Sequence, residues 1–398
     1  MTSAARPRYA YRWFAVAAAS WFFGWTIQGV LFTWLVIDDA KSAAGTLGNV
    51  QTVLALPGPL IALLGGALAD RFDRRAMLVA GHAGMFALSL LLALGSQRGA
   101  LSLPVMLGYA LCAGALQGMV LPTRQAFLSD VAGSDLMRAV TLLTVVQSSA
   151  QVAGPLTGAS TAWLGVERGL VLQALVFLGG AVALRFTPRS HLHDGSSATR
   201  ATAKELLQGF RVTIRSRARR APLLAATAHA LGYVGPLYVL LPVLVRDVYG
   251  GGIGGIGVAA ALFPAGIVLG SILSLRAARR GLHRGTMMLA GLGAAGILVA
   301  LLGTAPPLPV LYVAIPCWGG AASVVFNTTR TLVQETAEPS LRARAAGLLM
   351  TGTLLAGPVS SFVAGTTAHA IGPLATCVAF GLLMTCSAAA LWPSRGER

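Results

Sequence analysis

The sequence has little charge, and its charged residues leave long gaps between them. Asp, Glu, Lys and Arg make up 11% of the 398 residues. A helix needs about 20 residues to cross a hydrocarbon core. Eight uncharged stretches are near this length, and two are about twice as long. The sequence therefore predicts a membrane protein with several spans. The ten stretches are 13–37, 42–69, 76–97, 99–123, 139–166, 169–184, 221–245, 248–275, 285–329 and 345–396.

The stretches also lack the short alternating pattern of barrel strands. Backbone polar groups in lipid must be bonded within the spanning segment, so spans of this length are predicted to be helices. The two long stretches must each turn back. One contains Pro306, Pro307 and Pro309, and the other contains Gly372 followed by Pro373. Such residues end helices and begin turns. The predicted fold is an all-α integral membrane protein with twelve transmembrane helices.

The residues needed for metal binding or catalysis are also missing from the spans. The 4 cysteines form no CxxC pair, so no metal site is expected. No span contains an HExxH motif, an acidic pair or a Ser–His pair at an evident spacing, which argues against an intramembrane enzyme and leaves no catalytic residue to assign. None of the 13 acidic residues lies in the middle of a span, so no buried carboxylate relay is visible. No cofactor is expected.

The positive charges predict the orientation of the chain. Short cytoplasmic loops carry the excess of Lys and Arg. With the N-terminus inside, 26 of the 30 fall on the cytoplasmic side, and only Lys41, Arg98, Arg168 and Arg246 fall outside. Both termini are therefore predicted to be cytoplasmic. This topology and attraction to anionic lipid account for the net charge of +17, so the lipid bilayer is an expected partner and nucleic acid is not.

The chain is built as two copies of one plan. We predict an N-terminal six-helix bundle at 1–186, a cytoplasmic basic linker at 187–220 and a C-terminal six-helix bundle at 221–398. Such a duplication is typical of transporters, whose substrate site lies near the midplane between the halves. Landmarks recur at an offset of 203 to 206 residues: Gly66 with Gly270, Thr123-Arg124 with Thr329-Arg330, Leu136 with Leu341, and Gly154-Pro155 with Gly357-Pro358.

The loop between the second and third spans carries a recognisable motif. Residues 65–75 read Gly-Gly-Ala-Leu-Ala-Asp-Arg-Phe-Asp-Arg-Arg. This segment resembles the signature of the major facilitator superfamily, with Asp73 where the common pattern has Gly. The resemblance implies that Asp70 is a cytoplasmic gate carboxylate acting on the positive end of a helix in the opposite half. It further implies that the gate motif includes Gly66, Arg71, Arg74 and Arg75. A carboxylate near a helix N-terminus contributes about 0.3–2 kcal/mol.

A second gate is suggested by charges in two equivalent loops. The hypothesis is that these charges form salt bridges between the halves when the cytoplasmic side closes, and the alternative is ordinary solvated loop charge. The candidate residues are Asp130, Asp135 and Arg138 after the fourth span, and Glu335, Arg342 and Arg344 after the tenth.

The fifth span contains Gly154-Pro155-Leu-Thr-Gly158. This segment resembles the Gly-Pro motif that drug and metabolite antiporters of the superfamily carry in the same span. Proline removes a backbone hydrogen bond and small neighbours permit close packing, so the motif predicts a bend or a helix contact. Its second copy at Gly357 favours a structural role common to both halves.

Two further segments resemble one branch of the superfamily. Residues 121–128 read Leu-Pro-Thr-Arg-Gln-Ala-Phe-Leu, and residues 340–344 read Ser-Leu-Arg-Ala-Arg. Both resemble the branch that includes the enterobactin exporter and related secretion-type permeases. This resemblance implies export of a small amphipathic product such as a siderophore, a macrolide or a drug.

The candidate substrate cavity consists of polar and aromatic residues at intermediate depth. The resemblance implies that spans 1, 4, 7 and 10 line the cavity. His229 is the candidate for proton coupling or substrate binding, because histidine titrates in the physiological range. The alternative is a histidine hydrogen-bonded between packed helices. The candidate residues are Trp25, Gln28, Tyr109, Gln117, His229, Tyr233, Trp318 and Asn327, with Gln147 and Gln151 in span 5.

Together these observations predict a multi-pass transporter of a bacterial inner membrane. The preferred function is alternating-access export of a small molecule in exchange for protons, with the proton gradient as energy source. The chain is expected to act as a monomer on a small-molecule substrate. An importer or facilitator of a neutral metabolite is the alternative, because the spans lack carboxylates. A receptor that does not transport is a third reading.

Overall fold

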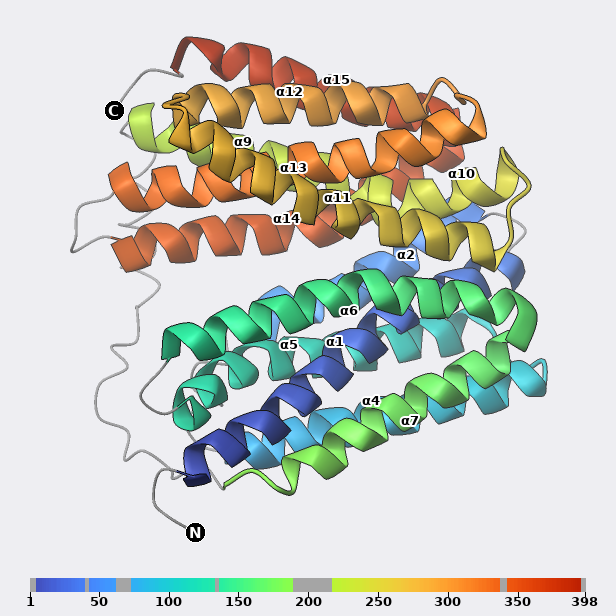
Figure 1. The fold of residues 1–398 in the computed structure, drawn as a ribbon. Coiled ribbons are helices and arrows are strands. Elements are labelled where there is room, and N and C mark those ends of the chain that lie inside the picture. The colour runs from blue at the N-terminus through green and yellow to red at the C-terminus, as the bar shows by residue number, and fades with distance from the viewer. Residues whose placement is uncertain are drawn as a thin grey trace. The chain divides into compact units, whose positions relative to one another are not determined.

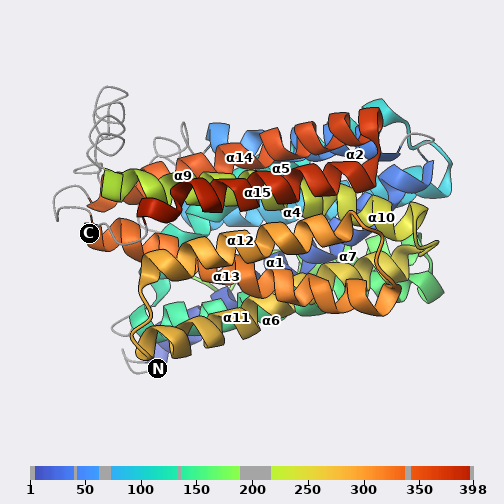
Figure 2. The ribbon, with the colours of Figure 1, turned by 90° about the horizontal axis from the view of Figure 1, so that it is seen from above.

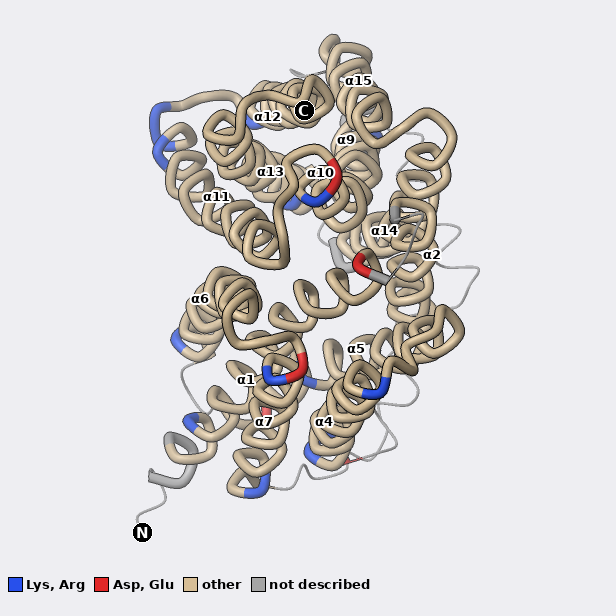
Figure 3. The backbone as a smooth tube through the Cα atoms, turned by 90° about the vertical axis from the view of Figure 1, so that its right-hand side faces the viewer, with Lys and Arg blue, Asp and Glu red and all other residues tan. Residues whose placement is uncertain are grey.

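The structure is a computed structural model that describes residues 5–39, 43–61, 73–132, 136–188, 217–336 and 342–394. Its regular elements in these ranges are helices (Figure 1), as the all-α prediction requires. Eleven of the described helices are long and apolar enough to cross a membrane. Figure 3 shows that most of the described chain is free of Lys, Arg, Asp and Glu. The described parts of the uncharged stretches lie largely within these helices.

The chain divides into two compact units, called unit 1 and unit 2 below. Unit 1 comprises 1–39, 53–197 and 251–261, and unit 2 comprises 40–52, 198–250 and 262–398. The predicted division into two bundles joined by a linker remains a prediction.

Unit 1 is built mainly from five long helices. Helix α1 packs against α5, α6 and α7, and α4 packs against α5 and α7. Its core includes Phe14, Trp21, Phe127 and Phe177, which are almost fully buried. The helices are α1 (Ala5–Asp39), α4 (Arg74–Gln97), α5 (Leu103–Val131), α6 (Leu136–Leu164) and α7 (Val166–Leu184), joined by the first residues of α11 (Ile253–Arg279).

Unit 2 contains most of α2 (Ala43–Ala55), the remainder of α11 and six further helices. Helix α12 packs against α13 and α15, and α9 packs against α13, α14 and α15. Figure 2 shows α12 and α15 running side by side. The six helices are α9 (Arg217–Gly235), α10 (Leu241–Asp247), α12 (Arg284–Leu302), α13 (Leu308–Thr336), α14 (Arg342–Ile371) and α15 (Pro373–Leu391).

Both long uncharged stretches turn back, as predicted. Helix α12 ends at Leu302 and α13 begins at Leu308, with two of the three prolines in the connection. Helix α14 ends at Ile371 and α15 begins at Pro373. The intervening Gly372 has φ +87°, a conformation that residues with a side chain rarely adopt. These two turns confirm the interpretation of each stretch as two spans.

The stretch 221–245 forms one span that contains an irregular turn. Residues Pro236–Leu240 form a π-helix between α9 and α10. Pro236 has no N–H and therefore cannot continue the α-helical ladder. The N–H of Gly235 instead donates to Ser360 Oγ at 2.7 Å, and that hydroxyl donates to Leu231 O at 2.5 Å. The helix α14 thus supplies the partner for the backbone at the irregular turn.

Several helices extend beyond the uncharged stretches, and one predicted span is described only in part. Helix α5 continues to Val131, so Arg124 lies about two turns inside a helix rather than in a loop. The second predicted span, 42–69, is described only in part: α2 ends at Ala55, residues 57–61 are helical, and 62–72 lie outside the described residues. The count of twelve helices and the orientation of the termini therefore remain predictions.

Candidate functional site

The centre of the predicted gate motif lies outside the described residues. Gly66, Asp70 and Arg71 belong to 62–72, and Asp135 belongs to 133–135. Arg342 and Arg344 are in α14, but the description does not extend to their side chains. Their gate roles stay predictions.

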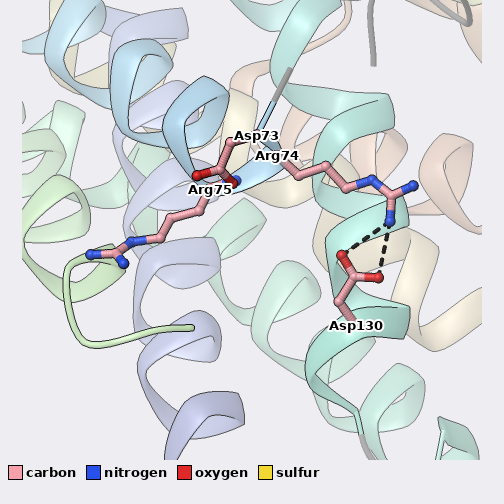
Figure 4. A network of polar contacts seen from close by, with 4 residues as sticks. All are labelled: Asp73, Arg74, Arg75 and Asp130. Carbon is pink, nitrogen blue, oxygen red and sulfur yellow. Dashed lines mark hydrogen bonds and ion pairs between the residues drawn. The ribbon is translucent and has the colours of Figure 1, made fainter. Parts of the chain in front are cut away.

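The structure describes residues 73–75 of the gate motif, which form the N-terminal end of α4 and its cap. Asp73 is the N-cap residue, and its Oδ1 accepts a hydrogen bond from the backbone N–H of Arg75 at 3.0 Å. The side chain of Arg75, which Figure 4 shows pointing away from Arg74, donates to the backbone carbonyl of Arg185 at 2.7 Å. Aspartate is a preferred N-cap residue because its carboxylate satisfies a free N–H of the first turn. The departure from the family pattern at Asp73 therefore has a structural explanation.

Two of the predicted gate acids have ion-pair partners within their own unit. Arg74 binds Asp130 with both carboxylate oxygens in reach, at 2.9 and 3.0 Å (Figure 4). This pair joins the start of α4 to the end of α5. In unit 2, Arg284 at the start of α12 pairs with Glu335 at the end of α13. Arg138 lies on the exposed side of α6. Each pair joins two neighbouring helices within one unit. The predicted role of these charges between the halves stays a prediction.

We expect the Arg74–Asp130 pair to contribute little to stability. The two side chains are 22% and 26% exposed, and pairs of this kind contribute about 0.2–1 kcal/mol. A double-mutant cycle with Arg74→Gln and Asp130→Asn, read as thermal unfolding of the purified chain, should return a coupling energy in that range. Arg280→Gln, at an exposed arginine, is the control. A coupling energy several times larger would mean that the pair supports more than one helix contact.

The Gly-Pro motif of the fifth span is a contact between α6 and α1. A Cβ on Gly158 would lie 2.8 Å from Val30 Cβ, and one on Gly154 would overlap Thr26 Oγ1. Thr26 Oγ1 also donates to Ala150 O at 3.0 Å. The two glycines are one turn apart, so α1 approaches closely along this line. The second copy of the motif makes no such close contact with a described residue, because a Cβ on Gly357 would have no described atom within 4 Å.

Two of the predicted cavity residues in unit 1 meet at a buried polar cluster. Gln28 on α1 and Tyr109 on α5 are 1% and 6% exposed, and Gln173 on α7 is fully buried. Gln28 Nε2, Tyr109 OH and both amide atoms of Gln173 make no hydrogen bond of good geometry among the described residues, although Tyr109 OH lies close enough to the amides of Gln28 and Gln173 to interact with them. The Tyr109 ring packs on Phe32 with 4.6 Å between centroids. Buried polar atoms are normally paired, so this cluster is suited to binding a polar guest.

The other predicted cavity residues in unit 1 have different surroundings. Gln117 is engaged within the unit, because its Oε1 accepts a hydrogen bond from Trp21 Nε1 at 2.8 Å. Trp25, Gln147 and Gln151 are half-buried.

Unit 2 holds a cluster of aromatic rings around His229. The His229 and Tyr233 rings stack with 5.1 Å between centroids, and Phe326 meets His229 edge-on at 4.9 Å. Tyr233 stacks on Phe263, which in turn meets Trp318 at 4.8 Å. Both ring nitrogens of His229 and Nε1 of Trp318 are buried without a partner among the described residues. We call these five residues the aromatic cluster.

Neither ring nitrogen of His229 has, among the described residues, the hydrogen bond that the alternative reading requires, and both readings stay predictions. The predicted cavity residue Asn327 is exposed and donates to Ser271 Oγ at 3.3 Å, outside the cluster. Sequence reasoning missed Phe263 and Phe326, because an apolar ring in an apolar span carries no distinguishing signal. The fourth uncharged stretch also stops at residue 123, whereas Arg124 lies within α5.

Comparisons with known proteins agree with this architecture. Residues 14–361 match the Major Facilitator Superfamily. An uncharacterized MFS-type transporter of Mycobacterium tuberculosis is 30% identical over 353 residues, which cover 83% of this chain and 78% of the relative. The multidrug efflux pump Tap of the same species is 25% identical over 389 residues, covering 90% and 87%.

Solved structures show the same fold at low identity. The nucleoside transporter NupG superposes with a TM-score of 0.78 at 13% identity, covering 98% of this chain and 100% of that one. A D-xylose-proton symporter superposes with a TM-score of 0.75 at 15% identity, covering 98% and 99%. With a family match over most of its length and this fold, the chain belongs to the major facilitator superfamily of transporters.

Proposed function

We propose that this protein is an alternating-access exporter of small amphipathic molecules, driven by the proton gradient across a bacterial inner membrane. The observation that carries the proposal is the aromatic cluster, which combines apolar rings with unpartnered nitrogens. The similarity to Tap, a multidrug efflux pump, supports the direction of transport. We further propose that the chain works as a monomeric antiporter.

The aromatic cluster suits a planar substrate with one polar edge. Stacked and edge-on aromatic pairs contribute about 0.5–1.5 kcal/mol each beyond the burial of their area. Phe326 is 37% exposed, so it is the ring that a substrate would displace to reach His229. The histidine nitrogens and Trp318 Nε1 would then bind the polar edge. Such a site selects by shape and polarity rather than by one fixed group, as an exporter of varied compounds requires.

His229 is also the proposed proton-binding group. The acidic residues of the sequence lie outside the middle of the spans, which leaves histidine as the group with a suitable ordinary pKa. A histidine without a fixed hydrogen-bond partner is free to exchange its proton for substrate.

Import of a neutral metabolite is the second candidate function. The cluster of Gln28, Tyr109 and Gln173 favours it, because amide and phenol groups bind hydroxyl-rich or amide-bearing molecules without requiring charge. Tests with sugars and nucleosides address this candidate directly.

The first test measures accumulation of siderophores, macrolides and lipophilic cations in efflux-deficient cells, with and without a protonophore. Cells expressing the protein should accumulate less of at least one class, and the protonophore should remove the difference. Asp70→Asn should weaken export without loss of membrane insertion, because a carboxylate at a helix N-terminus biases a two-state equilibrium by about 0.3–2 kcal/mol.

Two results would count against the proposal. Unchanged accumulation of every class, together with uptake of a neutral metabolite, would favour the importer. Wild-type turnover of the Asp70→Asn variant would remove the gate assignment while leaving export itself in place.

A further inference from the structure

Arg124 is a buried cation that the proposed mechanism does not use. It lies on α5, seven residues before the helix ends at Val131. The residue is 5% exposed, and its Nε and Nη1 atoms have no hydrogen-bond partner among the described residues. Buried charges are normally paired or bound to a ligand. A buried guanidinium whose Nε and Nη1 have no bond among the described residues therefore indicates a site for an anion.

The surroundings of Arg124 hold its side chain while leaving Nε and Nη1 without a bond among the described residues. The guanidinium carbon lies over the Phe22 ring, 3.9 Å from the ring centroid. A cation–π contact uses the face of the guanidinium. The hydrogen-bond donors lie in the plane of the group, at its edge, and remain available to a ligand.

Neighbouring polar side chains already have partners of their own. Trp21 Nε1 donates to Gln117, and Thr123 Oγ1 donates to Met119 O at 2.7 Å. His82, which is near enough for its charge to interact with that of Arg124, has backbone carbonyls at both ring nitrogens. None of these groups is neutralising or bonded to Arg124 Nε or Nη1 in the described part of the chain, so an outside anion would meet little competition.

We propose that Arg124 is an anion-binding site and that the transported molecule carries a carboxylate, sulfonate or phosphate group beside an apolar body. The anionic oxygens would accept hydrogen bonds from Nε and Nη1, a charge-assisted geometry in which arginine excels. The apolar body would lie against Phe22. This inference rests on the proposed transport function for the role of the anion as substrate, while the binding site stands on the geometry alone.

The test uses two fluorescent probes with the same rings. Anilinonaphthalene sulfonate is anionic, and phenylnaphthylamine lacks the sulfonate. Binding of each is measured to the purified full chain in nanodiscs of zwitterionic lipid, with empty nanodiscs as the blank. The wild type should bind the sulfonate more tightly. Arg124→Gln should weaken sulfonate binding by about ten-fold or more and neutral binding by less than about two-fold.

Three further variants keep the result interpretable if Arg124→Gln folds poorly. Arg124→Lys retains the charge without the planar fork and should show an intermediate loss. Phe22→Leu should weaken sulfonate binding in part. Arg330→Gln, at the exposed arginine that matches Arg124 in the second half, should leave both affinities unchanged.

Equal affinity of the wild type for the two probes would overturn the proposal, as would an equal loss of both in Arg124→Gln. Phosphatidylglycerol added to the nanodiscs separates two sources of the anion: competition at Arg124 identifies a lipid headgroup, and its absence identifies a soluble ligand. Arg124-dependent binding without any export in cells would uphold the anion site and contradict the exporter. Export that is unchanged in Arg124→Gln would uphold the exporter and contradict the role of Arg124 in binding the transported anion.

Discussion

Gly154→Leu is expected to remove most of the correctly folded protein from the membrane. A Cβ at this position already overlaps Thr26 Oγ1 and would lie 3.1 Å from Phe23 O, and leucine adds three more carbons. Overpacking costs about 1–3 kcal/mol where neighbours can shift. Here the neighbours are the backbone of α1 and a hydroxyl bonded to Ala150 O. We expect a loss of about ten-fold or more in monodisperse protein, measured by size-exclusion chromatography of a fluorescent fusion.

Gly357→Leu is the matched control, because it changes the second copy of the same motif. A Cβ there meets no described atom within 4 Å, so this variant should fold normally. Gly179→Leu on α7, another position with no described atom in reach, controls for leucine in a span. Equal damage from the Gly154 and Gly357 substitutions would show that the Gly-Pro dipeptide matters for helix bending rather than for the contact with α1.

His229→Phe is expected to impair transport without lowering the stability of the fold. The substitution keeps a ring that stacks on Tyr233 and meets Phe326 edge-on, but removes two buried nitrogens that have no described partner. A buried polar group without a partner costs about 1–3 kcal/mol, so thermal stability should stay equal or rise. Affinity for a polar aromatic substrate should fall by about 2- to 12-fold, the value of one hydrogen bond. Transport should lose its dependence on the proton gradient.

His82→Phe is the control for this experiment. His82 is also a buried histidine in a span, but its Nδ1 lies 2.8 Å from Leu78 O and its Nε2 lies 3.1 Å from Ala17 O. Whichever nitrogen carries the proton has a carbonyl to bond, so its loss should lower stability. Gradient-driven transport per folded molecule should be retained. If His229→Phe destabilises the protein and leaves proton coupling intact, His229 is a structural residue and the coupling group must be sought elsewhere.

Much of the architecture was predictable, because it depends on local properties of the chain. A helix crosses lipid only if its residues are apolar over a fixed length, and the spacing of the charged residues along the chain shows where this condition is met. The turns at Pro306 and Gly372 follow from the backbone chemistry of single residues. Boundaries were less predictable: charge marks where polar residues begin, whereas α5 and α13 continue past Arg124 and Arg330 as helices.

The candidate sites show what only the tertiary structure decided. His82 and His229 are both lone histidines in apolar spans, yet one is bonded to backbone and the other is not. Arg124 and Arg330 occupy matching positions of the repeat, yet only Arg124 is buried, against Phe22. Gly154 is pressed against α1 while Gly357 has room around it. The sequence shows where each span lies and which groups it carries. Whether a group is paired depends on which other helices meet it, and residues far apart in the chain decide that.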